Sequence, residues 1–448
     1  MPPGEIATPL TEKFSVPLGR GMTYFTLPGG MTGQAVLSRA EPSLGDPEAA
    51  ALLALQAPIN SPSLRELARG AQSVCIVVTD ATRACPDHLL VPPMLQMLAE
   101  AGIAADAVTI LIATGAHRAS TETERREKLG DAIVDRYRII DHDASAANSL
   151  LPVDPGEGGV PFRVNRIAVE ADLLIATGVV EPHQYAGYSG GGKTVAIGCA
   201  DEAMIAYTHG PAMLDRPGTR LANLSGNPFQ AVVRRVARAA GLDFVANAVI
   251  GDDGKPIAIA YGAPEPVHDH LARVAARMFT VPIPSQVDVA VAGIGFPKDC
   301  NLYQASRAAS YLQFAPIPVV RRGGTIILPA ACPEGAGTGA GERRFASAMR
   351  QPGGSQGVID RARAQAIRPG EQRAYVMARV LQDVRVVVVG SENPDVIRTL
   401  GFVTAATIDE ALREARDAHG AKSVAIVPHA LLTLPIVGEQ DQLAAQEE

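Results

Sequence analysis

The sequence predicts an α/β protein made of two α/β domains, with mainly parallel sheets flanked by helices and an active site in the inter-domain cleft. Short apolar runs rich in Val, Ile and Ala alternate with longer helical patterns, which is typical of parallel sheets covered by helices. Polar side chains follow several of these runs directly, where open α/β sheets bind their ligands. A proline-rich segment at 281–287 reads as a linker between two such regions.

The predicted domains are residues 1–280 and 281–448, and the last segment, about 423–448, is a candidate for packing back on the first domain. Strands are expected in the first domain at 74–79, 107–113, 172–179, 243–250 and 257–262. Strands are expected in the second domain at 288–293, 325–329, 384–390 and 423–427. Helices are expected at 92–105, 121–137 and 229–240, and Ser63 with Glu66 fits a helix capping box.

Composition excludes several classes of function. The 448 residues are 47% hydrophobic and 19% charged, which is ordinary for a globular protein. A net charge of −7 and the absence of Trp argue against nucleic acid or an anionic membrane as partner. The five cysteines form no CxxC pair, so neither a disulfide framework nor a structural zinc site is expected. Residues 1–14 lack the features of a signal peptide, and a cytoplasmic location is expected.

Residues 181–209, EPHQYAGYSGGGKTVAIGCADEAMIAYTH, hold the densest group of candidate functional side chains. His183 comes just after a predicted buried strand, and a glycine-rich turn leads from it to Lys193. His209 follows sixteen residues after the lysine, at the end of a predicted helix. Glycines before a helix let the backbone approach an anion closely, with free N–H groups directed at it. The stretch therefore predicts a binding site with two titratable imidazoles beside it.

A phosphate-binding loop is one interpretation of this stretch. Gly187 to Thr194 fits the pattern GxxxxGK[ST]. Such a nucleotide enzyme also needs an acid after an apolar strand to hold Mg²⁺, and the clear candidate, Asp80, lies upstream in the chain. Two histidines around the lysine are not needed for that function. These residues alone do not exclude a phosphate-binding loop.

Further polar groups follow other predicted strands. Asp80, Thr82 and Arg83 come after the first strand, and His117 comes after the second. Taken alone, Asp80 can be a helix cap and His117 a solvated loop residue. Because loops at the carboxyl ends of one sheet meet in one crevice, a shared site is the more economical interpretation. In the second domain the corresponding position carries Tyr303, Gln304 and Arg307, whereas His142 and His268 are expected at the surface.

Six motifs together resemble the nickel-pincer nucleotide-dependent lactate racemase family of 2-hydroxy acid racemases and epimerases. The resemblance extends from about residue 14 to 435, and its motifs occur in the family's order. They are DATR at 80–83, TGAHR at 114–118, EPHQYAGYSGGGK at 181–193, YTH at 207–209, PKDCNLYQ at 297–304 and CPEGAG at 332–337.

The resemblance implies a cofactor and a set of site residues. The cofactor is the Ni(II)-pyridinium-3,5-bisthiocarboxylate mononucleotide, covalently attached at Lys193, with His209 as a nickel ligand. Cofactor-biosynthesis enzymes are the implied transient protein partners, and a small 2-hydroxy acid is the implied substrate. The general bases correspond to His117 and His183. The other implied contacts are Asp80, Ala81, Thr82, Arg83, Ser189 and Gly190 to the cofactor, and Arg83, Tyr303, Gln304 and Arg307 to the substrate.

The residues agree with this chemistry. The α-hydrogen of a 2-hydroxy acid is easier to remove as hydride when a base takes the hydroxyl proton. Two histidines, one for each orientation of the planar keto acid, suit work on both stereoisomers. Because each must be neutral to act as a base, activity is expected to fall on the acid side of roughly pH 6–7.

Two departures from the family pattern bear on the substrate. Arg307 stands where the family's lactate enzymes carry a lysine, and Gln184 stands where an aromatic residue is common. Both changes favour a 2-hydroxy acid larger or more polar than lactate, such as a sugar acid or a hydroxy dicarboxylic acid. A hydride-shuttle enzyme with a reaction other than racemisation, and a non-catalytic binding protein of the same fold, remain alternatives.

Overall fold

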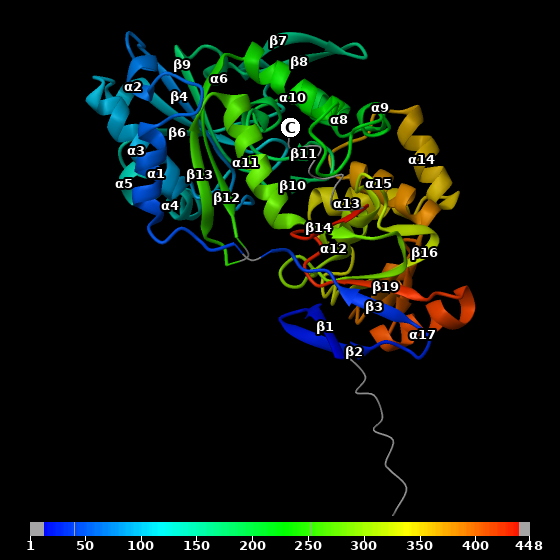
Figure 1. Ribbon diagram of the computed structural model, residues 1–448. Helices are drawn as coiled ribbons and strands as arrows, with labels where there is room; N and C mark the ends of the chain where they lie inside the picture. Colours follow the sequence, from blue (N-terminus) through cyan, green and yellow to red (C-terminus); the bar gives the residue numbers. More distant parts are fainter. Residues whose placement is uncertain (1–12, 40, 252, 439–448) are drawn as a thin grey trace, which may run out of the picture. The chain divides into compact units, whose positions relative to one another are not determined.

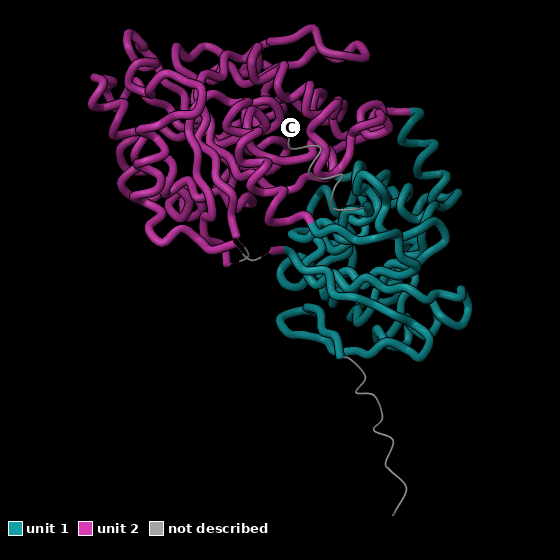
Figure 2. The backbone as a smooth tube through the Cα atoms, viewed as in Figure 1, with its two compact units in different colours: residues 1–38, 281–364, 370–448 teal, residues 39–280, 365–369 magenta. Residues whose placement is uncertain are grey.

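The computed structural model describes residues 13–39, 41–251 and 253–438. The N-terminal residues 1–12 and the polar tail at 439–448, which the sequence analysis considered, lie outside the described residues. The chain forms two compact units (Figure 2), which we call unit 1 and unit 2. Unit 1 comprises Met1–Ser38, Val281–Ala364 and Gly370–Glu448, and unit 2 comprises Arg39–Thr280 and Gln365–Pro369.

Unit 2 is built on a six-stranded sheet with the order β13-β12-β9-β4-β5-β6. Its neighbouring strands are parallel except for the antiparallel pair of β12 and β13. The two central strands, β4 and β9, are buried along their whole length, as their continuous apolar sequences predict. The strands are β4 (Val74–Thr79), β5 (Val108–Ala113), β6 (Arg138–Asp141), β9 (Leu173–Val179), β12 (Leu242–Ile250) and β13 (Pro256–Gly262).

Helices cover both faces of this sheet. Figure 1 shows α1 and α3 on one side and α10 and α11 on the other. Two short hairpins, β7–β8 (Leu150–Glu157 and Val160–Asn165) and β10–β11 (Pro182–His183 and Gly187–Tyr188), complete the unit. The helices are α1 (Pro47–Gln56), α2 (Leu64–Leu67), α3 (Asp87–Glu100), α4 (Glu122–Leu129), α5 (Asp131–Val134), α6 (Arg166–Val169), α7 (Lys193–Ala196), α8 (Glu202–Thr208), α9 (Pro211–Leu214), α10 (Pro228–Ala239) and α11 (Pro264–Phe279).

Unit 1 contains a second six-stranded sheet, with the order β18-β17-β16-β15-β19-β3 and parallel neighbours throughout. Its strands are β3 (Thr32–Ala35), β15 (Val287–Ala292), β16 (Val320–Pro329), β17 (Arg385–Val389), β18 (Val403–Ala405) and β19 (Ser423–Val427). Two-stranded pairs are formed by β1 (Lys13–Leu18) with β2 (Gly21–Thr26) and by β14 (Thr280–Ile283) with β20 (Leu434–Val437). The helices are α12 (Leu302–Gln313), α13 (Ala340–Met349), α14 (Gly354–Ala364), α15 (Glu371–Asp383), α16 (Pro394–Arg398) and α17 (Ile408–His419).

The predicted α/β class with mainly parallel sheets is confirmed, and each predicted strand has a counterpart in one of the two sheets. The capping box of Ser63 and Glu66 is also present. The predicted helix at 121–137 is divided into α4 and α5, because Gly130 between them adopts a φ of +85° that a helix does not tolerate. The predicted helix after the glycine turn is likewise divided, into α7 and α8.

The division of the chain differs from the predicted domains at the N-terminus. The first 38 residues belong to unit 1, because β3 hydrogen-bonds to β19 at the edge of the unit 1 sheet. The strand β19 itself lies inside that sheet and belongs to unit 1. The segment read as a linker, 281–287, includes residues of β14 and β15. The chain also passes from unit 2 to unit 1 between Thr280 and Val281, at the start of this segment.

The strand order creates a switch point in each sheet. In unit 2 the chain runs from β4 outward to β5 and β6, and then returns to β9 on the other side of β4. In unit 1 it runs from β15 outward to β18 and returns to β19 on the other side of β15. Loops at such reversals diverge and leave a crevice at the carboxyl ends of the strands. No helix of the described residues is long and apolar enough to cross a bilayer.

Candidate active site

Three adjacent strands of unit 2 deliver the candidate residues. Asp80 follows β4 directly, His117 lies in the loop after β5, and His183 lies four residues after β9. These strands are neighbours in the order β9-β4-β5, with the switch point between β9 and β4. The fold therefore gathers three of the four predicted polar sites at one edge of one sheet.

His117 and Asp80 form a hydrogen-bonded pair. Nδ1 of His117 lies 2.6 Å from Oδ2 of Asp80, and the hydroxyl of Thr82 donates to Oδ1 at 2.8 Å. Burial acts to raise the pKa of Asp80, but the hydrogen bond and charge of His117, with Thr82 and Arg83, hold it below its usual value. The carboxylate therefore accepts a hydrogen bond from Nδ1–H, and Nε2 of the neutral ring carries the lone pair. The side chain of His117 is 53% exposed, so this lone pair is accessible to a ligand.

A buried ion pair supports the loop that carries Asp80. Nζ of Lys128, on α4, lies 2.8 Å from Oδ2 of Asp87, and the two side chains are 9% and 0% exposed. The same ammonium group donates to the carbonyl oxygens of Arg83 and Cys85, each at 3.3 Å. The hydroxyl of Thr79 donates to Asp87 at 3.2 Å. Lys128 thus links the helix after His117 to the loop of Asp80, a role that the charged pattern of α4 did not suggest.

His183 is held by backbone groups. It ends the two-residue strand β10, and the chain turns back into β11 through Gln184, Tyr185 and Ala186. Its Nδ1 accepts hydrogen bonds from the backbone N–H groups of Tyr185 at 3.3 Å and Ala186 at 3.1 Å. A nitrogen that accepts two N–H groups carries no proton, so the neutral ring has its proton on Nε2.

The glycine-rich turn needs its glycines. Gly190 has a φ of +84°, and a Cβ there would lie 2.6 Å from both Oδ1 of Asn247 and Cγ2 of Val180. The N–H of Gly191 donates to the same Asn247 oxygen at 2.8 Å. The hydroxyl of Ser189 donates to the carbonyl of Val179 at 2.7 Å, so it ties the turn to the end of β9. The predicted contacts of Ser189 and Gly190 with a cofactor stay predictions.

Lys193, which begins α7, has an unusually acidic ammonium group. Its pKa is lowered to about 7, first by burial and then by the charge of Arg83, while Glu181 and Asp80 oppose the shift. These interactions place the amine near the loop of residues 80–83. A large fraction of the amine is neutral at physiological pH and is therefore nucleophilic.

His209 is suited to bind a metal. Burial, the charge of Lys193 and the charge of Arg83 lower the pKa of its ring to about 4, against a hydrogen bond with the carbonyl of Ile205 that raises it. Its Nδ1 lies 3.0 Å from that carbonyl, which places the proton there and the lone pair on Nε2. The part of the chain that the structure describes contains no cluster of three or more His, Cys, Asp or Glu side chains arranged for a metal.

An aromatic cluster lies between the two histidines of residues 181–209, His183 and His209. The ring of Phe229, at the start of α10, lies 5.3 Å from His209 and 6.1 Å from His183 between centroids. Tyr185 packs on both histidines, at 5.7 Å and 5.6 Å. The sequence predicts a helix that begins at Phe229 but no role for this residue, since nothing in its local pattern distinguishes a site residue from a core residue.

Two predicted surface histidines are buried instead. His142 is 3% exposed, and its Nε2 lies 2.9 Å from the carbonyl of Ala200. His268 is 1% exposed, and its Nε2 lies 3.0 Å from the carbonyl of Ser189. Their partners lie 58 and 79 residues away along the chain, which explains why local sequence suggested solvent exposure.

In unit 1 the predicted substrate residues lie on α12, which follows the switch-point strand β15. Asn301 caps this helix by accepting the N–H of Gln304 at 3.0 Å. Tyr303, Gln304 and Arg307 are all partly exposed. Arg307 donates to the hydroxyl of Tyr311 at 3.3 Å, one turn further along the same face. Arg307, the predicted cationic group, therefore lies on the same face of α12 as Tyr311.

Comparison with known proteins decides the family. The model of the lactate racemase N-terminal domain matches residues 18–222, and that of the lactate racemase C-terminal domain matches residues 282–433. The chain belongs to the lactate racemase family. This family is one of isomerases, and the chain is an enzyme of that class. The phosphate-loop interpretation of Gly187–Thr194 thereby loses its basis, and α7 is only four residues long.

Relatives and solved structures agree with this assignment. The lactate racemase of Lactiplantibacillus plantarum is 33% identical over 84% of this chain and 88% of its own length. That of Thermoanaerobacterium thermosaccharolyticum is 30% identical over 80% and 83%. The lactate racemase apoprotein structure from the latter organism covers 96% of this chain and 100% of its own, with a TM-score of 0.85 and 27% identity. A Thermotoga maritima protein with 19% identity and a TM-score of 0.64 shares the fold.

Proposed function

We propose that this protein interconverts the stereoisomers of a 2-hydroxy acid with a nickel-pincer nucleotide attached to Lys193. The observation that carries the proposal is the Asp80–His117 pair beside a lysine whose pKa is about 7, at the switch point of the unit 2 sheet. The names of the relatives, lactate racemases, support the reaction class.

The residues fit the proposed cofactor. Lys193 offers a partly neutral amine for covalent attachment, and His209 offers a neutral imidazole whose Nε2 lone pair suits a nickel ion. Ala81, Thr82 and Arg83 are exposed in the loop after β4, and they would hold a phosphate or sugar hydroxyl of the cofactor. When bound, the pyridinium supplies an acceptor and donor for the hydrogen on the substrate α-carbon.

The side chains of unit 2 then divide the remaining steps. Nε2 of His117 accepts the proton of the substrate hydroxyl, and Asp80 stabilises the imidazolium that results. Arg83 binds the substrate carboxylate through paired N–H donors. The keto acid then has to reorient in the site, and in its other orientation His183 donates a hydrogen bond from Nε2–H to the substrate oxygen. The proton that His117 accepted returns to that oxygen by way of water, since the ring of His117 is 53% exposed.

The substrate is proposed to be larger or more polar than lactate, as a sugar acid or a hydroxy dicarboxylic acid is. A guanidinium group of unit 1 supports this proposal. Arg307 is a planar, partly exposed cation on α12, at the position where the family's lactate enzymes carry a lysine.

The test is a racemisation assay of the cofactor-loaded protein with lactate, malate, tartrate, glycerate and gluconate. We expect each active substrate to convert to its other isomer without loss of the α-deuterium to water, because the hydrogen moves as hydride. We also expect a polar acid to have the highest kcat/KM. Faster turnover of lactate than of every polar acid would overturn the substrate proposal, whereas rapid exchange of α-deuterium with water would overturn the reaction.

A further inference from the structure

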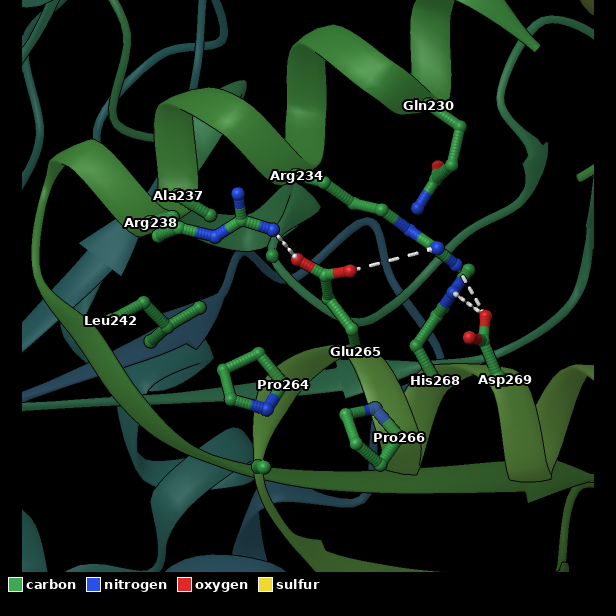
Figure 3. A pocket seen from close by; sticks show the side chains of 12 residues that line it. Gln230, Arg234, Ala237, Arg238, Leu242, Pro264, Glu265, Pro266, His268 and Asp269 are labelled. Atoms are coloured by element: carbon green, nitrogen blue, oxygen red, sulfur yellow. Dashed lines mark hydrogen bonds and ion pairs between the residues drawn. The ribbon is translucent and has the colours of Figure 1, made fainter. Parts of the chain in front are cut away.

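Two groups of charged side chains in unit 2 have no part in the proposed function. One lines a pocket of about 450 Å³ between α10 and α11, where charged side chains such as Arg238 and Glu265 pair with one another (Figure 3). The other surrounds the buried ion pair of Asp87 and Lys128, and its hydrogen bonds reach the loop of residues 80–86. The second group is therefore connected to the candidate active site.

The carboxylate of Asp87 gathers donors from two strands, a loop and a helix. The hydroxyl of Thr79, at the end of β4, donates to it at 3.2 Å, and the hydroxyl of Thr177, in β9, donates to its other oxygen. The thiol of Cys85 lies 3.4 Å from it, and Nζ of Lys128 lies 2.8 Å from it. Since β4 and β9 flank the switch point, this one carboxylate joins both strands to the loop after β4. The side chain is 0% exposed, so any effect on a reaction has to pass through its neighbours.

The ammonium group of Lys128 has three N–H donors and three acceptors around it. The acceptors are the carboxylate of Asp87 and the carbonyl oxygens of Arg83 and Cys85, each carbonyl at 3.3 Å. The two carbonyl groups lie on either side of Ala84, so the lysine fixes the course of the loop there. Its side chain is only 9% exposed, and little water is available to replace these bonds.

Lys128 connects the two loops whose side chains form the Asp80–His117 pair. The N–H of Arg83 donates to the carbonyl of Asp80 at 3.1 Å, so the turn that carries Asp80 ends at a residue bound to the lysine. Lys128 itself lies on α4, the helix that follows the loop of His117. The 2.6 Å contact between Oδ2 of Asp80 and Nδ1 of His117 requires both loops to be in place.

The same network reaches the helix that begins with Lys193. The hydroxyl of Thr194 donates to the carbonyl of Thr177 at 2.7 Å, and the hydroxyl of Thr177 donates to Asp87. The first turn of α7 is thereby joined to the carboxylate that Lys128 binds.

We propose that Lys128, together with Asp87, is a positioning residue for racemisation: it holds the loop of residues 80–86 so that Asp80 stays hydrogen-bonded to Nδ1 of His117. The inference rests on the proposed function, in which Asp80 fixes the tautomer of the base. Lys128 and Asp87 do not touch the reacting atoms, and they act through Asp80.

The first experiment measures the tautomer of His117 in the apoprotein by nitrogen-15 NMR at mildly alkaline pH. His117→Gln identifies the signals of this ring. We expect the Nδ1–H tautomer to dominate in the unmodified protein and its population to fall by about half or more in Lys128→Met, because the carboxylate no longer fixes the proton on Nδ1. An unchanged tautomer in folded Lys128→Met, or Nε2–H in the unmodified protein, would overturn the proposal.

Two control variants remove a cation from ion pairs that do not reach the loop. Arg126→Met does so on α4 itself, two residues before Lys128, where Arg126 pairs with acidic side chains between residues 122 and 135. Arg238→Met does so in the pocket of Figure 3. Both should keep the Nδ1–H tautomer, since exposed ion pairs contribute little to the fold.

A second variant covers the case in which Lys128→Met does not fold, because it leaves a buried carboxylate without its cation. Lys128→Met/Asp87→Asn removes both charges and still lacks a donor for the carbonyl groups of Arg83 and Cys85. We expect the same fall in the Nδ1–H population in this variant. Retention of the tautomer in it would equally overturn the proposal.

The second experiment is a double-mutant cycle in the cofactor-loaded enzyme. We expect Lys128→Met to lower kcat/KM by about tenfold or more, but by less than about twofold when Asp80→Asn is already present, because the lysine acts through Asp80. Equal losses in both backgrounds would indicate a general structural role and contradict the proposal. The tautomer of the apoprotein needs neither cofactor nor turnover, so a failure of the Lys128 assignment is distinct from a failure of the proposed function.

Discussion

His117 and His183 follow neighbouring strands of one sheet, yet their rings are held in opposite ways. His117 donates from Nδ1 to the carboxylate of Asp80, whereas Nδ1 of His183 accepts from the backbone N–H groups of Tyr185 and Ala186. In the neutral rings, the outer nitrogen of His117 therefore carries a lone pair and that of His183 carries a proton. Two residues that a motif describes equally as bases are chemically different in the folded protein.

The difference assigns different tasks to the two histidines. His117 is prepared to accept the hydroxyl proton, and Asp80 stabilises the charge that follows. His183 is prepared to donate a hydrogen bond, as a neutral electrophile does, and protonation of its Nδ1 would break two backbone hydrogen bonds. For a substrate with a single stereocentre the equilibrium constant is one, so steady-state kcat/KM must be equal in both directions. Single-turnover formation of keto acid from each isomer is the measurement that separates the two histidines.

The largest expected effect is that of Asp80→Asn. The amide would present an N–H group to Nδ1 of His117 and move the ring proton to Nε2, so the base is lost. We expect kcat/KM to fall on the order of 10³- to 10⁴-fold, with single-turnover keto acid formation from one isomer affected most. Asp143→Asn, which makes the same change in an exposed loop, serves as the control. Equal loss from both isomers in single turnover would contradict the asymmetry.

The turn after His183 is tested by Gly190→Ala. The left-handed φ of +84° and the 2.6 Å approach of a Cβ to Asn247 should together lower the free energy of unfolding by about 2–4 kcal/mol. Gly241→Ala is the matched control, because it has a φ of +81° and nothing within 4 Å of its Cβ, and it should cost about 1 kcal/mol. Denaturant unfolding of the apoprotein measures both. Equal costs would show that the close packing of the turn does not matter.

Glutamine substitutions sharpen the comparison of the histidines. A glutamine side chain keeps an N–H donor but is no base. We expect His183→Gln to retain about tenfold more activity than His183→Ala, since one hydrogen bond is kept. His117→Gln should be no better than His117→Ala. The four variants are compared by kcat, with KM measured to separate binding from chemistry. The reverse ranking would show that His183 is the essential base.

The smallest effect concerns the charge of Lys193. Its pKa of about 7 lies below the ordinary value of 10.5, so between these two pH values the unfolded chain binds more protons than the folded one. The stability of the apoprotein should therefore rise with pH over that window, and Lys193→Met should remove this rise and increase the Tm at pH 7. Because Asp80 raises the pKa of Lys193, Asp80→Asn should shift the pH dependence of its reaction with an amine reagent to lower pH. A rate that rises only near pH 10 in both proteins would contradict the burial of the amine.

Sequence reasoning succeeded where the pattern is local. Continuous apolar runs correctly located the buried strands of the sheets. The polar residues that follow these strands mark the switch point of unit 2. It missed β3, whose sequence TGQA carries no apolar run and becomes a strand only by pairing with β19, which lies almost 400 residues away.

Contacts between distant segments were equally hidden. Lys128 occurs in the charged sequence ETERREKL, which is typical of an exposed helix, and its burial depends on Asp87 from another helix. Asn247 and His268 hold the glycine turn from segments more than 50 residues away. The direction of each hydrogen bond at His117 and His183 also depends on the folded loops, so the motif could name both residues but could not distinguish them.

The most direct test of the whole account is the intact mass and nickel content of the protein produced together with the cofactor-biosynthesis enzymes. The account predicts a covalent adduct that peptide mapping places on Lys193, with about one nickel ion per chain, and its absence in Lys193→Ala. An unmodified Lys193 without nickel, under conditions in which a relative such as the Lactiplantibacillus plantarum lactate racemase does acquire the adduct, would contradict it.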